Sequence, residues 1–151
     1  MMKFLSALLL SIIFGWGGKI QVIQSTSQEW AGGLQESGYG TDYKLTIKAK
    51  AGSDLLQIDD LWVGDIHMKV RVMADPANPQ NNNFKEGSQV SLKAGITYLP
   101  DADGRIRPLA ADSKKKPFNF KGEGLLGYTY KGHKAYLVIA EFKKLEKIIY
   151  P

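Results

Sequence analysis

Three aspartates and two histidines are the residues whose types and spacing could support catalysis. Asp59, Asp60 and Asp65 are close enough in sequence for two carboxylates to act as acid and base in a hydrolase. Adjacent residues of a strand point to opposite faces, so Asp59 and Asp60 would diverge unless a bulge turned them together. We expect His67, on the polar face of a strand, and His133, in a tight turn, to be solvated.

The residue inventory favours a protein without catalytic machinery. The chain has no cysteine, and it lacks the motifs of a nucleophile elbow, a zinc-binding helix and a phosphate-binding loop. We therefore expect a non-enzymatic protein that needs no cofactor, with a carboxylate-dependent hydrolase as the less favoured alternative.

One segment resembles the start of a calcium loop. Asp101 and Asp103 precede Gly104, but Arg105 and Arg107 stand where further acidic ligands would be needed. A hairpin turn explains the same residues, so we predict a turn and no metal site.

The glycine and aromatic segment 30–43 contains the candidate ligand-binding residues, Trp30 and Tyr39. Exposed aromatic side chains can stack on sugar rings or enter a partner's pocket, and glycines permit close approach. In the alternative interpretation, Trp30 and Tyr43 are core anchors and the glycines form turns. We expect Trp30 to belong to the core and Tyr39 to be exposed.

Alternation of apolar and polar residues dominates the chain and predicts half-buried strands. The clearest strands are expected at residues 43–50, 66–72, 90–98, 125–130 and 135–142. Weaker strands are expected at 19–24, 55–63 and 105–107, and residues 141–149 could form a helix or continue the preceding strand. Together these predict an all-β fold, an antiparallel β-sandwich of about seven to nine strands in one domain.

Three finer expectations follow from this pattern. The stretch 55–63 is apolar on both parities, which indicates a bulge at Asp59 and Asp60 or burial on both faces. A loop at Gly132 and His133 would pair Tyr130 with Ala135 and place six apolar residues on one face. Residues 74–88 should be an exposed loop, whose role the sequence leaves open.

The first seventeen residues have the layout of a secretory signal peptide. Lys3 precedes an apolar run too short to span a bilayer, and glycines follow it. We expect residues 1–17 to be removed and residues 18–151 to form the domain, in the periplasm, outside the cell or at its surface.

Positive charge is concentrated toward the end of the chain. Residues 19–100 carry 8 basic and 9 acidic side chains, a net of −1, whereas residues 101–151 carry 11 and 6, a net of +5. The run Lys114, Lys115 and Lys116 could touch an anionic surface, although a solvated loop explains it as well. It lacks interleaved aromatic residues, so nucleic-acid binding is not predicted.

Three further motifs occur in the chain, namely Trp-x-Gly-Gly at 30–33, Gly-Tyr-Gly-Thr-x-Tyr at 38–43 and Leu-Trp-Val-Gly at 61–64. With these, the first half of the expected domain resembles small exported β-proteins of Bacteroidota-type bacteria, a resemblance that implies no particular activity. We expect an exported protein that acts by binding a carbohydrate, a peptide or a protein. The alternative from a different class is a small eight-stranded outer-membrane β-barrel, which would need lipid-facing strands of about ten residues.

Overall fold

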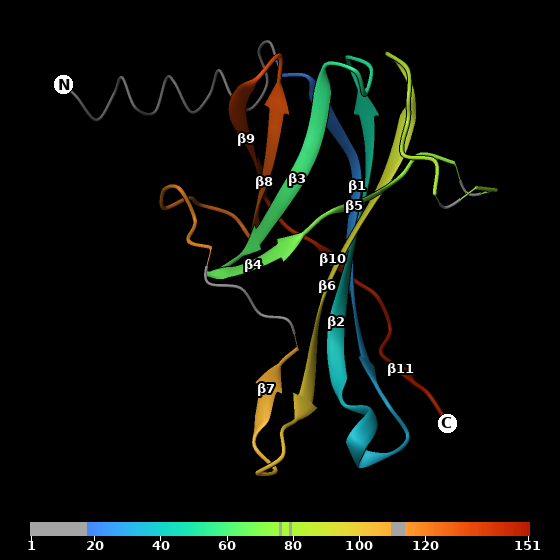
Figure 1. The fold of residues 1–151 in the computed structure, drawn as a ribbon, viewed down its shortest axis with the longest axis vertical. Helices are drawn as coiled ribbons and strands as arrows, with labels where there is room; N and C mark the ends of the chain where they lie inside the picture. The colour runs from blue at the N-terminus through green and yellow to red at the C-terminus, as the bar shows by residue number, and fades with distance from the viewer. Residues whose placement is uncertain (1–17, 76, 79, 110–113) are drawn as a thin grey trace.

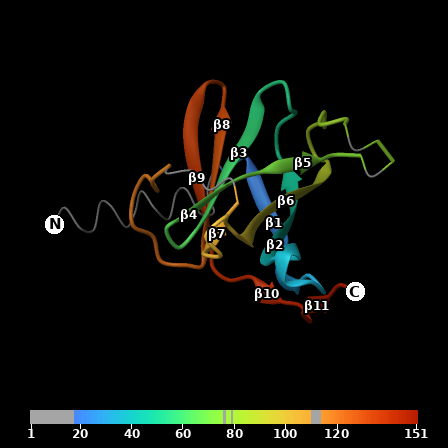
Figure 2. The same ribbon diagram turned by 60° about the horizontal axis from the view of Figure 1, so that its bottom comes forward.

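The computed structural model describes residues 18–75, 77, 78, 80–109 and 114–151, and the expected signal peptide at 1–17 lies outside them. The described chain is all-β, and its two packed sheets form a sandwich (Figures 1 and 2). The predicted fold class is therefore confirmed. Within this part of the chain, no helix is long and apolar enough to cross a membrane.

The larger sheet contains seven strands of the described chain. They are β1 (Ile20–Ala31), β2 (Tyr39–Ala49), β5 (Arg71–Met73), β6 (Gln89–Pro100), β7 (Ile106–Pro108), β10 (Lys143–Lys144) and β11 (Ile148–Ile149). Its order is β10-β1-β2-β6-β5, with β11 beside β1 and β7 beside β6. The smaller sheet has the order β4-β3-β8-β9, from β4 (Ile66–Lys69), β3 (Leu56–Val63), β8 (Gly124–Tyr130) and β9 (His133–Ile139).

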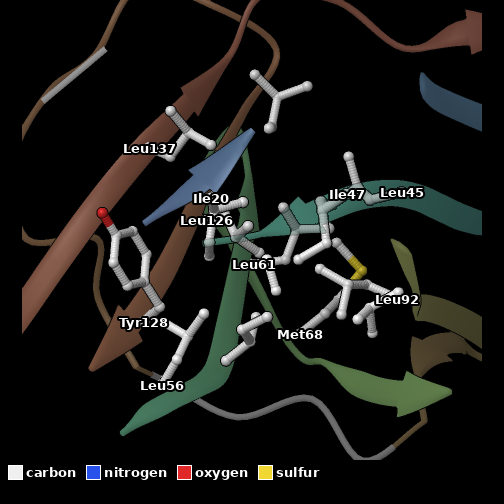
Figure 3. Close-up of a cluster of buried hydrophobic side chains, with 14 of the residues drawn as sticks. Ile20, Leu45, Ile47, Leu56, Leu61, Met68, Leu92, Leu126, Tyr128 and Leu137 are labelled. Carbon is white, nitrogen blue, oxygen red and sulfur yellow. The ribbon is translucent and has the colours of Figure 1, made fainter. Parts of the chain in front are cut away.

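The main core lies between the inner faces of the two sheets (Figure 3). Leu45 of β2 is paired with Leu92 of β6, and both are buried against Leu61 of β3 and Leu126 of β8. Alternate residues of the same strands point outward, as the period of a strand requires. The strands β1, β2 and β6 extend past the smaller sheet, with β7 at that far end (Figure 1).

Strand β3 is buried on both faces and contains the bulge that its sequence predicts. The register shifts between Ile58 and Asp60, opposite β8. Leu61 faces the main core, whereas Trp62 is buried but does not belong to that core. Both explanations offered for the apolar stretch 55–63 are therefore correct at once.

The predicted strand 66–72 is two strands in different sheets. The chain leaves the smaller sheet after β4 and enters the larger sheet at β5, with Val70 at the crossing. The Val70 amide donates to the Asp59 carbonyl at 3.0 Å. Within β4 itself, Ile66 at the turn is exposed while Met68 is buried.

The last hairpin has the predicted strands but a shifted loop. Its two loop residues are Lys131 and Gly132, both with positive φ, and Tyr130 pairs with His133 instead of Ala135. Positive φ at both loop positions matches the turn that suits the twist of a hairpin. The predicted register is wrong by two residues. Because side chains of a strand alternate with a period of two, each one still lies on its predicted face.

The segment after β9 is neither a helix nor a continuation of that strand. It crosses to the edge of the larger sheet, where β10 and β11 pair in parallel with β1. The strand count exceeds the predicted range because such short edge strands give no alternation signal. Between β5 and β6, the described residues of the predicted loop form no strand.

Replacing a leucine of the last hairpin tests which face is buried. We expect Leu137→Ala to lower the free energy of unfolding by about 2–5 kcal/mol, since Leu137 belongs to the core. The control Thr129→Ala should cost less than about 1 kcal/mol, because its hydroxyl makes only a 3.5 Å contact with Asp59. Urea denaturation measures both, and a larger cost for Thr129→Ala would contradict the assignment of faces.

Candidate functional site

The two sequence-predicted ligand residues, Trp30 and Tyr39, lie on opposite faces of the larger sheet. Trp30 pairs with Gly40, whereas Tyr39 pairs with Ala31. Adjacent residues of a strand alternate in direction, so the two rings point away from each other. The fold therefore does not combine them in a single binding surface, and a role for either one alone stays a prediction.

Each ring has its own aromatic neighbour. Tyr39 is 46% exposed, as expected, and stacks on Tyr98 with ring centroids 5.2 Å apart. Trp30 is half-buried and lies outside the main core, against Tyr150 and over Gly40, where a Cβ would collide with its ring. The expectation that Trp30 is a core anchor is therefore wrong, whereas Tyr43 does pack against the core.

Asp101 closes the turn between β6 and β7 through hydrogen bonds to both of its carboxylate oxygens. Its Oδ1 accepts hydrogen bonds from the amides of Asp103 and Arg105, both at 2.9 Å, and its Oδ2 accepts one from Arg107 Nε at 2.7 Å. Gly104 has a φ of 77°, as the turn requires. No group of potential metal ligands occurs among the described residues.

The most buried charged group lies on the outer face of the smaller sheet. Asp60 of β3 is 3% exposed, and its Oδ1 lies 2.7 Å from Nε2 of His67. Its Oδ2 lies 2.9 Å from Nζ of Lys114 and 3.6 Å from Nζ of Lys134. His67 is 7% exposed, so the expectation that it is solvated is wrong. The reason is the segment that covers it.

Residues 114–120 cover this outer face and form a small second core. Trp62, which is 1% exposed, donates from Nε1 to the carbonyl of Lys114 at 3.2 Å. Phe118 packs edge-on against Tyr136 with ring centroids 5.5 Å apart. Lys116 forms an ion pair of 2.7 Å with Asp65. A residue on the polar parity of a strand is buried wherever another segment covers that face, which alternation alone does not reveal.

The partners of Asp60 hold its carboxyl in the ionised form. Burial opposes ionisation of the Asp60 carboxyl, but the hydrogen bonds and charges of Lys114 and His67 outweigh it and hold its pKa below the ordinary 3.8. The hydrogen bond to Asp60 also raises the pKa of Lys114. Asp59 instead meets Thr129 and Asp65 meets Lys116, so the three carboxylates face separate partners.

A second cluster, which the sequence did not predict, lies on the outer face of the larger sheet. Lys44 of β2 pairs with Lys93 of β6, and Lys93 pairs with Arg71 of β5. Directly paired residues of adjacent strands point to the same side, so the three cations form one row across the sheet. Lys69, the last residue of β4, lies beside them.

These cations line a hollow of about 650 Å³, which we call the basic groove. Its lining side chains include four cations, Lys44, Lys69, Arg71 and Lys93, and a single carboxylate, Asp42. The other lining residues are the polar Thr26, Gln28 and Thr97, together with Tyr43, Ala94, Gly95 and Leu145. The groove therefore presents positive charge together with groups that donate and accept hydrogen bonds.

The cations of the groove have no carboxylate partner in the described parts of the chain. None of the ion pairs formed there involves Lys44, Lys93 or Arg71. Like charges directly opposite one another destabilise a sheet. Departures from such local rules are expected at functional sites. The basic groove is therefore our candidate functional site.

The run Lys114, Lys115 and Lys116, which the sequence singles out for anionic surfaces, is differently placed. Lys114 and Lys116 form ion pairs with Asp60 and Asp65. The groove was missed because its cations are separated by up to 49 positions, from Lys44 to Lys93, and only the strand register brings them together.

Comparisons of the chain with models of protein families, with curated proteins and with solved structures find no match.

The pKa of Asp60 predicts how acid affects stability. This pKa is lower in the folded than in the unfolded chain, so the unfolded chain binds more protons. The free energy of unfolding therefore decreases as the pH is lowered. The contribution is complete above the unfolded value and is lost as the pH falls through the lower folded value. We expect Asp60→Asn to flatten this acid limb of unfolding free energy, measured by denaturant titration at several pH values.

Asp65→Asn is the matched control. Its carboxylate is 86% exposed although it is paired with Lys116, and exposed ion pairs contribute little to stability. It should keep the acid limb of the parent. An Asp60→Asn protein with an unchanged acid limb would contradict the role assigned to the cluster.

Proposed function

We propose that this protein is an exported, non-enzymatic β-sandwich that binds an anionic ligand in the basic groove. The row Lys44, Lys93 and Arg71 is the observation that carries the proposal. These side chains come from three strands, are exposed, and are held in register by the same pairing that builds the core. An anion that contacts all three would relieve their mutual repulsion on binding.

Rigid strands are well suited to such a site. Charged groups on paired strands keep their spacing, whereas groups on a loop must be ordered when the ligand binds. Hydrogen bonds between a cationic side chain and an anion are shorter and stronger than neutral ones. Thr97 and the Oε1 of Gln28 add groups that can recognise the uncharged parts of a ligand, whereas Thr26 is buried and Gln28 Nε2 donates to the Glu146 carbonyl.

Binding to a panel of anionic polymers tests the proposal. Polygalacturonate, polyphosphate and heparin would be titrated against the protein by calorimetry at low and high salt, with dextran as the neutral polymer. We expect at least one anionic polymer to bind, less tightly at high salt because salt screens exposed charges. Lys93→Gln should weaken that binding about tenfold, because a hydrogen bond to a charged group is worth about 1.5 kcal/mol or more.

Lys48→Gln is the matched control for this experiment. Lys48 is exposed on the same face of β2, but its cross-strand neighbours are Gln21 and Gln89, which carry no charge. It should bind like the parent. Without ligand, Lys93→Gln should also raise the free energy of unfolding at low salt by about 0.2–1 kcal/mol, since a repulsive pair is lost. Equal losses in both variants, or no binding of any anionic polymer, would contradict the proposal.

A further inference from the structure

We infer that the ligand of the basic groove is an acidic polysaccharide that crosses the strands in an extended form, from Lys143 on β10 to Arg71 on β5. This inference rests on the proposed function and narrows it in two respects. It specifies the path of the ligand over the sheet, and it specifies the chemistry that accompanies the acidic groups.

The path follows from the register. Lys143 pairs with Thr26, and Thr26 pairs with Lys44, so the row of the groove continues across β1 to the edge of the sheet. Neighbouring strands are about 4.8 Å apart, so the four steps from β10 to β5 span about 19 Å. One step is close to the length of one sugar unit in an extended chain. Such a row suits a ligand whose acidic groups recur along its length.

The direction of Lys143 is consistent with its neighbours on β10. Phe142, just before the strand, is buried and packs edge-on against Tyr43 on the inner side of the sheet, with ring centroids 5.0 Å apart. Lys144, just after Lys143, pairs with Ser27 and lines a different, smaller hollow with it. Alternation therefore places Lys143 on the outer face with the groove and Lys144 on the inner face.

The uncharged groups of the groove favour a ligand with hydroxyl groups. Thr26, Gln28 and Thr97 line it together with the cations, and the Asp42 carboxylate lies across Gly95 in their midst. A carboxylate accepts hydrogen bonds only, so it needs a donor, which the hydroxyls of a sugar chain supply and an inorganic polyphosphate does not. A chain of uronic acids supplies both the hydroxyls and the carboxylates that these side chains match.

A nucleic acid fits the same surface less well. Proteins that bind single strands combine positive charge with aromatic side chains on which the bases stack. Tyr43 is the aromatic residue among those that line the groove, and its ring is engaged with Phe142 on the inner side. The residues that line the groove thus offer charge and hydrogen bonds but no free aromatic ring, and Trp30, on the same face of β1, lies outside the lining.

Two comparisons test the inference by calorimetry. The first measures the parent protein with polygalacturonate, galacturonate oligomers of increasing length, the monomer and polyphosphate. We expect affinity to rise with length until the row is filled, and polygalacturonate to bind at least tenfold more tightly than polyphosphate. Polyphosphate binding equally well or better would overturn the carbohydrate assignment, and equal affinity for monomer and oligomers would overturn the extended path.

The second comparison uses adjacent lysines that face opposite sides of the sheet. Lys143→Gln should weaken the binding of long oligomers several-fold and leave the shortest ones that bind unaffected, whereas Lys144→Gln should change neither. Equal effects of the two substitutions would refute the path across β10 even if Lys93→Gln abolishes binding, in which case the proposed anion site would stand. If no anionic polymer binds the parent, the proposed function itself fails.

Discussion

The register of β2 against β6 is the constraint on which both the core and the candidate site depend. It pairs Leu45 with Leu92 on the inner face and Lys44 with Lys93 on the outer face. A slip of one residue between the strands would turn one whole set of side chains to the wrong side. Burial of the leucines therefore fixes the position of the lysines, and the groove needs no separate structural support.

The energies involved show why this arrangement can persist. A repulsive cross-strand pair costs about 0.2–1 kcal/mol, whereas full burial of one leucine contributes about 1.5–3 kcal/mol. The two effects occur in adjacent rows of the sheet, since Leu45 and Leu92 lie next to Lys44 and Lys93 along the same strands. Hydrophobic burial offsets the repulsion, so the fold can hold the cations side by side at a modest cost in stability.

Alternation in the sequence predicted the strands well where one face is buried and the other is more exposed, as in β2, β6 and β9. It failed where a second segment changes the environment of a face. His67 stands at a polar position, yet it is buried, with Asp60 and the ring of Trp62 against it. The break at Val70 and the parallel strands β10 and β11 are likewise set by packing between distant segments, and two-residue strands are too short to show a period.

Charge illustrates the same limit for the candidate site. Net charge directed attention to the end of the chain, because residues 101–151 are strongly basic. Two cations of its densest run are engaged by Asp60 and Asp65, whereas residues 19–100, with a net charge of −1, contribute all four cations of the groove. A strand displays every second residue on one face. When the lysines of a strand stand at one parity and the acidic residues at the other, one face carries a concentrated positive charge although the segment as a whole is nearly neutral. The potential that a ligand meets is therefore a property of strand register, and it cannot be obtained by adding charges along the sequence.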